Sequence, residues 1–254
     1  MRYFMQLSYR GAPFHGWQCQ PGEVTVQSVL EDALSMILRR EMKITGAGRT
    51  DAGVNARMMV AHFDLDTPLG DAGELVRRLN AVVGKDIAVQ KIYEVEPDRH
   101  ARFDAVSRTY HYYAVTEKTP FFYPLSWKAP ATLDFDAMNR AAEILLETSD
   151  FTSFSKLHTD VKTNICRVSY ARWERLGEHE WVFVITADRF LRNMVRAVVG
   201  TLLDVGRGKL SVEGFRAVID GRDRALAAGS APAHGLFLTG VRYPDDIYLD
   251  PTNH

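Results

Sequence analysis

Residues 46–57 read GAGRTDAGVNAR, so three glycines surround one arginine, Arg49, and one aspartate, Asp51. A tight turn between two strands would account for this stretch, because the Asp51 side chain can accept a hydrogen bond from a backbone N–H while Arg49 stays solvated. A catalytic loop would account for it as well, because glycines let the backbone come close to a ligand. The stretch by itself leaves both interpretations open.

The segments around this stretch predict strands that alternate with helices. Strands are predicted at residues 2–9, 43–46, 58–65 and 87–95. Thr25 begins a predicted helix that runs to Arg40, and its apolar residues recur at three- and four-residue steps to form one face. Asp71 and Glu74 resemble a capping box and predict the start of a second helix, which runs to Val83.

The second half of the chain repeats this rhythm. Strands are predicted at residues 107–116, 166–176, 180–189 and 235–243, and helices at residues 136–147, 190–206 and 212–219. The order strand-helix-strand-helix-strand occurs twice, with hairpins. It predicts an α+β fold of two related halves, with mixed or mainly antiparallel sheets and flanking helices. We expect an N-terminal α/β half over residues 1–104, with the Asp51 loop, and a C-terminal α/β half over residues 105–254.

Composition is typical of a soluble globular protein. The chain has 254 residues, of which 46% are apolar and 25% charged, enough for one large domain or two packed ones. Cys19 and Cys166 form no disulfide framework or zinc spacing, which is compatible with a reducing compartment. The N-terminus lacks a signal-peptide core, and no run approaches the roughly 18 apolar residues needed to span a bilayer. We expect a cytoplasmic protein that does not contact a membrane.

The net charge of −1 does not by itself indicate nucleic-acid binding, because phosphate recognition usually needs a basic surface. Charge can nevertheless be segregated along the chain. Arginines gather in two places, namely Arg99, Arg102 and Arg108, and Arg189, Arg192, Arg196 and Arg207. Local basic patches on a neutral protein are therefore compatible with RNA binding.

Common catalytic signatures are missing from the sequence. It contains no GxGxxG that opens a helix after a strand, no P-loop, no GxSxG and no HExxH. The eight histidines are scattered without a metal-ligand spacing and are expected at the surface or in the core. The remaining option is a site without cofactor or metal, built from Asp, Arg and Tyr side chains.

Several stretches together indicate a family. FHGWQCQPGEVTVQSVLEDAL precedes the opening stretch, and RHARFDAVSRTYHYYAV, DFTSF, FLRNMVRAVVGTLLDVGRGK and APAHGLFLTGVRY follow it. In this order and at this spacing they closely resemble the tRNA pseudouridine synthase A family over almost the whole chain. The RTDAGV loop and the MVRxxVG helix are the specific parts, while YHYY or GLFL alone would mean little. Residues 156–164 match the family less clearly.

The resemblance implies a pseudouridine synthase fold, with two halves around a central cleft. It also implies an isomerase that detaches a uridine of tRNA at its C1′–N1 bond, rotates the base and reattaches it through C5. The family's targets are positions 38, 39 and 40 in the anticodon stem-loop, and no cofactor or metal is needed. The resemblance further implies a homodimer whose two subunits together hold one tRNA.

The resemblance also assigns residues. It maps the family's catalytic aspartate to Asp51, its tyrosine to Tyr110, its active-site arginine to Arg196, its apolar pocket leucine to Leu236, and the arginine of the catalytic loop to Arg49. Tyr110 would stack on the extruded base, because a base inside a stem cannot be reached without flipping. Leu236 would form the opposite wall, and Arg49 would fill the gap left by the base or hold a phosphate.

The chemistry of these residue types fits the reaction. Breaking a glycosidic bond develops positive charge at C1′, where a carboxylate can act as nucleophile or as a base that removes a sugar proton. Both roles stay open for Asp51, and a nearby guanidinium would keep it ionised. Arg192 and Arg196 stand four residues apart on a predicted helix and would share one face, with Arg192 as a further substrate-binding residue. Without the resemblance, both arginines are more readily interpreted as surface charges.

Other residues have two interpretations. Tyr110 could pack in a strand beside Tyr112, since residues two apart share a face. Phe154 could support the site or belong to the core. RNA docking is predicted for Arg10, Arg102, Arg108, Arg192, Arg207 and Lys209.

One position departs from the family, in which many members have histidine where this chain has Asn55. Asparagine can form hydrogen bonds but cannot titrate near neutral pH, so no acid–base role is expected at this position. Two other functions stay open on sequence alone: a non-catalytic tRNA-binding protein of the same fold, and a hydrolase acting on a small nucleoside.

Overall fold

The computed structural model describes residues 1–156 and 163–249, and its contacts divide the chain into two compact units. Unit 1 comprises Met1–Ser107 and Leu238–His254, and unit 2 comprises Arg108–Phe237. The expected division into residues 1–104 and 105–254 stays a prediction, because units defined by contacts need not follow the boundary between two related halves. Residues 157–162, within the segment that matches the family less clearly, lie outside the described residues.

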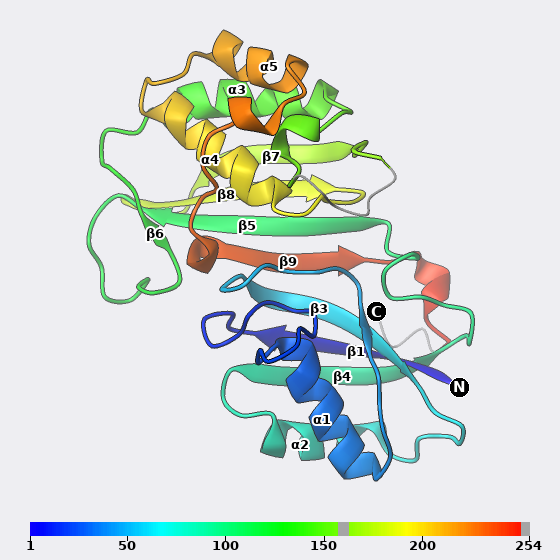
Figure 1. The fold of residues 1–254 in the computed structure, drawn as a ribbon. Coiled ribbons are helices and arrows are strands. Elements are labelled where there is room, and N and C mark those ends of the chain that lie inside the picture. The colour runs from blue at the N-terminus through cyan, green and yellow to red at the C-terminus, as the bar shows by residue number, and fades with distance from the viewer. Residues whose placement is uncertain (157–162, 250–254) are drawn as a thin grey trace. The chain divides into compact units, whose positions relative to one another are not determined.

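Unit 1 contains an antiparallel sheet (Figure 1). Its central strand β1 (Arg2–Tyr9) pairs with β3 (Asn55–Asp64) on one side and with β4 (Ile87–Val95) on the other. The short strand β2 (Thr45–Gly46) pairs with β3 and leads into the glycine-rich loop. The strands predicted from the sequence are confirmed, and those on either side of the loop hold its two ends.

Two helices cover strands of unit 1. They are α1 (Val26–Leu38) and α2 (Ala72–Val82), and α2 packs on both β4 and α1. Thr25 caps α1 through a reciprocal capping box with Ser28, and the Asp71 carboxylate caps α2 by accepting the Gly73 and Glu74 N–H groups. Both helix starts therefore match the sequence prediction.

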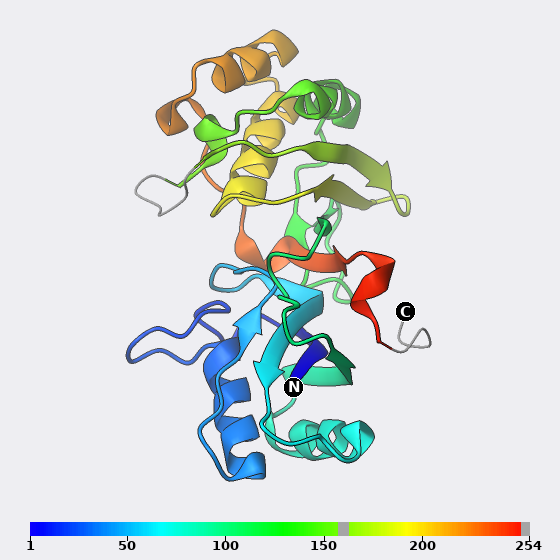
Figure 2. The same ribbon diagram turned by 90° about the vertical axis from the view of Figure 1, so that its right-hand side faces the viewer.

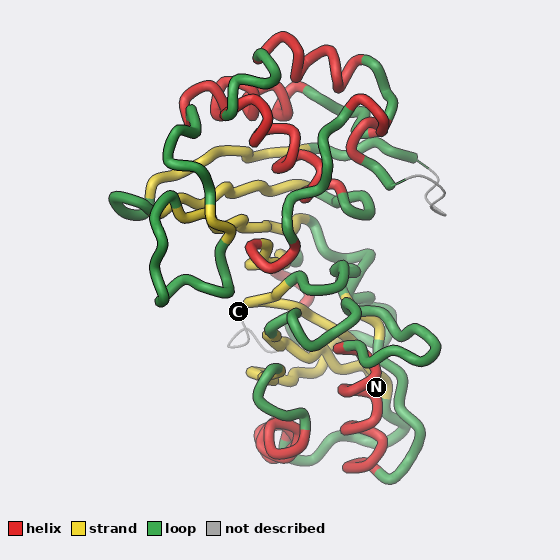
Figure 3. Tube along the Cα trace, turned by 60° about the vertical axis from the view of Figure 1, so that its left-hand side comes forward, coloured by secondary structure: helices red, strands yellow, loops and turns green. Residues whose placement is uncertain are grey.

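Unit 2 contains strands that pair mainly antiparallel. Its strand β8 (Glu180–Ala187) pairs with β5 (Ser107–Val115) and with β7 (Val168–Arg175), and the short β6 (Trp127–Lys128) runs parallel to β5. The helices α3 (Phe135–Glu147), α4 (Met194–Gly206) and α5 (Val212–Asp220) pack on one another, and α3 packs on β7. Figure 3 shows these helices gathered on one side of the strands of this unit. The last strand, β9 (Leu236–Arg242), begins in unit 2 and ends in unit 1.

In each unit, the side chain of an asparagine holds a helix to a strand by two hydrogen bonds. In unit 1 the Asn80 carboxamide of α2 donates to Val89 O of β4 and accepts from Val89 N, both at 2.8 Å. In unit 2 the Asn139 carboxamide of α3 donates to Trp173 O of β7 at 3.0 Å and accepts from Trp173 N at 2.7 Å. Figure 2 shows α2 beside β4 and α3 beside β7. The mixed sheet with flanking helices confirms the predicted α+β class.

One element begins later than predicted. The helix expected from residue 190 starts at Met194, because Asn193 adopts a left-handed conformation with φ of 63°. Arg192 therefore precedes α4, and the prediction that Arg192 and Arg196 lie on one face of a continuous helix is wrong. Within the described ranges, no helix is long and apolar enough to cross a membrane.

Candidate active site

Residues 47–54 of the glycine-rich stretch form a loop between β2 and β3. At its start, the Ala47 N–H donates to Val60 O of β3 at 2.7 Å. At its end, the Val54 N–H donates to Asp51 O at 3.1 Å, which closes a turn in which Gly53 has a φ of +78°. Asp51 is half-buried and Arg49 is exposed. The turn suggested by the sequence is thus present, and it presents both polar side chains on one short loop.

A second segment, which precedes α1, supports this loop from the side. The Trp17 N–H donates to Thr50 O at 3.1 Å, and the hydroxyls of Tyr9 and Thr50 are 2.8 Å apart in a buried hydrogen bond. Gly16 has a φ of +87°, and a Cβ there would lie 2.6 Å from Thr50 O. A side chain at position 16 would therefore push the backbone away from the residue that precedes Asp51.

Asn55, the position at which the sequence departs from the resemblance, has a structural role. It is 2% exposed, and its Oδ1 accepts the Gly11 N–H at 2.8 Å. A Cβ on Gly11 would lie 2.2 Å from Val54 O, so only glycine allows this approach. Asn55 thus ties the end of the loop to the residues after β1, a role that the sequence did not reveal.

Arg196 lies in unit 2, in the first turn of α4. Its Nε donates to Ala231 O at 2.8 Å, and its own carbonyl accepts the Ala231 N–H at 2.9 Å. The backbone of residues 229–231 can come this close because position 200 of the helix is glycine, where a Cβ would lie 1.9 Å from Gly229 O. One edge of the guanidinium is therefore fixed, as a preorganised positive charge requires.

Tyr110 lies on β5 opposite Ile185 of β8, and its ring packs in a T-shaped arrangement with that of Phe190 at a centroid distance of 5.2 Å. It is half-buried, whereas Tyr112, two residues later, is fully buried. The Tyr112 hydroxyl has no hydrogen-bond partner among the described residues. Burial raises the pKa of Tyr112, and the positive charge of Arg196 opposes this shift. Tyr112 is therefore a residue near Arg196 that the sequence suggested only as packing.

Leu236 is buried at the start of β9, just after Gly235. A Cβ on Gly235 would lie 3.1 Å from the end of the Tyr112 ring and 3.0 Å from Tyr113 O. Leu236 and Arg196 thus belong to segments of unit 2 that both approach Tyr112. The structure places Arg49 and Asp51 in unit 1, and Tyr110, Arg196 and Leu236 in unit 2.

The arginines predicted to dock RNA have varied surroundings. Arg10 forms an ion pair with Asp86 at 2.7 Å, and Arg207 one with Asp204 at 3.1 Å. Arg192 is exposed, and its carbonyl accepts the Lys156 N–H at 3.2 Å. The remaining side chains are Arg102, placed over the Phe103 ring, Arg108, which donates to Asp188 O, and Lys209, which is exposed. Their role in docking stays a prediction.

Phe154, for which the sequence offered two roles, has no exposed surface and stacks on Phe215 at a centroid distance of 5.9 Å. It belongs to the core of unit 2. Across residues 1–156 and 163–249, no group of three or more His, Cys, Asp or Glu side chains is placed to hold a metal ion. The prediction of a site without metal or cofactor remains a prediction.

Comparison with known proteins identifies the class. The family model described as tRNA pseudouridine synthase matches residues 141–244, which cover β7, β8, α4 and β9. This match and the α+β fold indicate a pseudouridine synthase.

Full-length relatives narrow the class. The chain is 56% identical to tRNA pseudouridine synthase A of Parabacteroides distasonis over 97% of this chain and 98% of the relative. It is 55% identical to the protein of that name from Bacteroides thetaiotaomicron, with 99% and 94% covered, and 53% identical to that of Bacteroides fragilis, with 97% and 98% covered. The chain belongs to the tRNA pseudouridine synthase A family, as the sequence resemblance implied.

Proposed function

We propose that this chain isomerises uridine to pseudouridine at positions 38, 39 and 40 of the anticodon stem-loop of tRNA, with Asp51 as the catalytic carboxylate. The observation that carries the proposal is the 56% identity to a tRNA pseudouridine synthase A over 97% of the chain. The Asp51 loop supports it, because this carboxylate stands on a loop held by β3, by Tyr9 of β1 and by the segment before α1.

In the proposed reaction, the bond between C1′ and N1 breaks and the base leaves with the bonding electrons. The Asp51 carboxylate either attacks C1′ or removes a proton from the sugar. The base then turns and bonds to C1′ through C5, and in this step the Asp51–C1′ bond breaks or the sugar takes its proton back from Asp51. The proton on C5 is replaced by one on N1, so the overall change is an isomerisation. None of these steps transfers electrons or a group to or from another molecule, so the proposal includes no cofactor.

The other assigned residues bind and orient the target nucleotide in this proposal. Tyr110 stacks on the extruded base and replaces the stacking that the base loses, and Leu236 supplies an apolar wall. The guanidinium of Arg196 stabilises negative charge, while Arg49 and Arg192 hold the RNA backbone. Support for Arg196 comes from its fixed geometry, because its Nε is held by Ala231 O.

A homodimer in the cytoplasm is part of the proposal. The net charge is −1, so phosphate binding must come from local basic surface rather than from the whole molecule. A dimer would combine the basic side chains of two subunits around one tRNA. Sedimentation equilibrium tests this point, with twice 28.7 kDa as the expected mass.

The experiment that tests the function is pseudouridine mapping on an unmodified tRNA transcript, incubated with the pure protein and no added cofactor. Asp51→Asn, which keeps the size of the side chain but removes its charge, is assayed beside it. We expect pseudouridine in the anticodon stem-loop with the unchanged protein and none with the variant. The variant should keep tRNA affinity within about threefold, because a nucleophile or base contributes mainly to the transition state.

Two results would contradict the proposal. Pseudouridine formed at an undiminished rate by Asp51→Asn would remove Asp51 from catalysis. Tight tRNA binding by the unchanged protein without any pseudouridine would indicate a non-catalytic tRNA-binding protein.

A further inference from the structure

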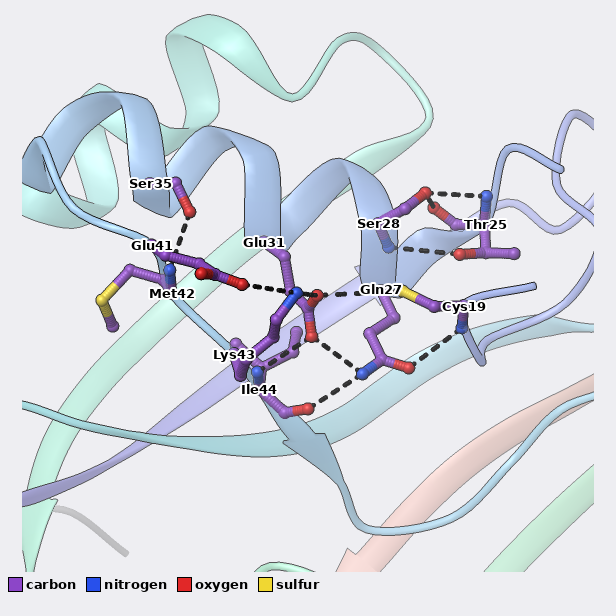
Figure 4. A network of polar contacts seen from close by, with 10 residues as sticks. All are labelled: Cys19, Thr25, Gln27, Ser28, Glu31, Ser35, Glu41, Met42, Lys43 and Ile44. Atoms are coloured by element: carbon purple, nitrogen blue, oxygen red, sulfur yellow. Dashed lines mark hydrogen bonds and ion pairs between the residues drawn. The ribbon is translucent and has the colours of Figure 1, made fainter. Parts of the chain in front are cut away.

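A buried carboxylate on α1 lies at the centre of a polar network that the proposed reaction does not use (Figure 4). Glu31 is only 7% exposed, although a glutamate on a helix usually faces the solvent. Its Oε1 accepts the Gln27 Nε2–H at 2.9 Å and the Ile44 N–H at 3.1 Å. Its Oε2 lies 3.3 Å from Lys43 Nζ. Burial of a carboxylate is costly unless such donors satisfy it, so this arrangement calls for a reason.

The first consequence of the network is that it fixes the strand that enters the Asp51 loop. Ile44 is held at both of its backbone polar groups: its N–H donates to Glu31, and its carbonyl accepts the Gln27 Nε2–H at 3.0 Å. The next residues, Thr45–Gly46, form β2, after which the loop begins. The helix thus sets the position from which the loop leaves the sheet.

The second consequence is that Gln27 also fixes residues 17–19, the segment that lies against Thr50 of the loop. Gln27 Oε1 accepts the Cys19 N–H at 3.1 Å, and the Gln27 backbone N–H donates to Trp17 O at 3.0 Å. Trp17 in turn donates its own N–H to Thr50 O, directly before Asp51. A Cβ on Gly46 would lie 2.6 Å from the Trp17 ring, so the two segments are also in close contact.

Gln27 therefore joins the two segments that enclose the loop, and every polar hydrogen and oxygen of its carboxamide is used. Glu31 orients this carboxamide by accepting one of its hydrogens and takes up the Ile44 N–H. From this geometry we infer that Gln27 and Glu31 are positioning residues, which hold the Asp51 loop in the arrangement that the reaction needs without touching the substrate. The inference rests on the proposed function, because it concerns the geometry of the same carboxylate.

The chain offers a matched control for an ordinary structural role. Asn80 in the same unit holds α2 to β4 by two hydrogen bonds of 2.8 Å, and neither partner belongs to the Asp51 loop or to the segment before α1. Asn80→Ala therefore removes an equivalent amide contact between helix and strand. Lys43→Ala is a second control, because it removes the ion pair of Glu31 but none of the bonds to the loop segments.

The experiment compares Gln27→Ala, Gln27→Asn, Glu31→Ala and Glu31→Gln with these controls. Three quantities are measured for each protein: the single-turnover rate of pseudouridine formation at saturating tRNA, the tRNA dissociation constant, and hydrogen–deuterium exchange of the loop amides. Gln27→Asn keeps the amide but shortens it by one methylene, so it tests the geometry in a protein that keeps its fold if the alanine variant does not. Glu31→Gln keeps an acceptor oxygen without the charge.

We expect Gln27→Ala, Gln27→Asn and Glu31→Ala to lower the single-turnover rate by about tenfold to a hundredfold, because small displacements of a reacting group cost that much. Their tRNA dissociation constants should change by less than about threefold, and their loop amides should exchange faster. Glu31→Gln should restore most of the rate. Asn80→Ala should lower the thermal midpoint of unfolding but leave the rate and the loop exchange within about twofold of the unchanged protein.

The inference is overturned if folded Gln27→Asn or Gln27→Ala reacts at the rate of the unchanged protein. It is also overturned if Asn80→Ala slows the reaction as much as Gln27→Ala does, because any loss of stability would then have the same effect. Failure of the proposed function looks different: the unchanged protein would form no pseudouridine at all.

Discussion

Arg196 shows how one hydrogen bond to the backbone can fix the orientation of a charged side chain. Its Nε is bound to Ala231 O, and this bond orients the plane of the guanidinium. Lysine at this position would have one compact ammonium in place of a planar group with several donors. The lysine ammonium would have to serve both Ala231 O and the substrate. A positive charge alone is therefore not enough at this position.

We expect Arg196→Lys to lower the single-turnover rate about a hundredfold, the size of effect that removal of one preorganised donor has in other enzymes. The measurement is pseudouridine formation at saturating tRNA. Arg216→Lys is the matched control, because Arg216 on α5 is largely exposed and lies 3.7 Å from Glu147. A rate for Arg196→Lys equal to that of the control would exclude the proposed electrostatic role.

Tyr110 combines a ring that can stack with a hydroxyl that can transfer a proton. Tyr110→Phe keeps the ring and its edge contact with Phe190, so tRNA affinity should change little. If the hydroxyl transfers a proton, the single-turnover rate should fall by about a hundredfold, within the range known for general acid–base groups. Tyr170→Phe, which removes an exposed hydroxyl bound to Glu174, serves as the control. An unchanged rate for Tyr110→Phe would leave Tyr110 with stacking alone.

The packing of helix α4 depends on a glycine inside the helix. Replacement of a helical glycine by alanine usually stabilises a helix by about 1 kcal/mol. Here a Cβ at position 200 would lie 1.9 Å from Gly229 O, a backbone atom that cannot move alone. The clash outweighs the gain in propensity, because overpacking that shifts a backbone costs about 1–3 kcal/mol.

We therefore expect Gly200→Ala to reduce the free energy of unfolding by up to about 2 kcal/mol and to lower the single-turnover rate as well. The second effect follows because residues 229–231, which hold Arg196, must move away from the helix. Urea unfolding and the pseudouridine assay measure the two effects. Gly214→Ala in α5 is the control, since the nearest obstacle there is the flexible end of Leu210. A stabilised and fully active Gly200→Ala protein would contradict this account.

Elements whose signals are local could be predicted from the sequence. Arg2–Tyr9 and Ile87–Val95 have the bounds that their alternating residues predict, and Thr25 and Asp71 begin their helices as caps. The start of α4 could not be predicted, because the residues before Met194 have helical composition. The left-handed conformation of Asn193 is instead accompanied by a hydrogen bond to Ser230, 37 residues away.

The candidate site also contains both residues that the sequence indicates and residues that it does not. The residue types of the loop with Arg49 and Asp51 are compatible with a turn and with a catalytic loop, and the family resemblance is what assigns it the catalytic role. Glu31 was not recognised, because a glutamate in a helix is expected at the surface, and its burial depends on Ile44 and Gln27 being correctly placed. Asn55 carries no local signal for its bond to Gly11, since the two residues are 44 positions apart.

The stability of the protein should respond to a histidine that the proposed reaction does not use. His62 on β3 is 7% exposed, and its Nδ1 accepts the Ala101 N–H at 3.2 Å, so the ring is neutral in the folded protein. Its ring lies 4.6 Å from that of His100. Burial lowers the pKa of His62 to about 4, and the positive charges of Arg2 and of protonated His100 act in the same direction.

The lowered pKa of His62 determines the direction in which the free energy of unfolding changes with pH. Between about pH 6.5 and pH 4 the unfolded chain binds a proton at His62 that the folded chain does not, so the free energy of unfolding falls as the pH falls through this range. Because one pKa unit corresponds to about 1.4 kcal/mol, this group should make the protein about 2 kcal/mol less stable at pH 5 than at pH 7. Carboxylates with lowered pKa values, such as Asp64, lose their contribution only at lower pH.

Urea unfolding at pH 7 and pH 5 measures this effect when the unchanged protein is compared with His62→Gln. Glutamine is neutral at both pH values, so the comparison cancels the titration of groups that the two proteins share. We expect the variant to be less stable at pH 7, because it loses ring contacts with Phe4 and His100. The stability advantage of the unchanged protein should then shrink by about 2 kcal/mol at pH 5. An advantage that stays constant between the two pH values would mean that His62 binds its proton equally well in both states, and burial on β3 would then not control its charge.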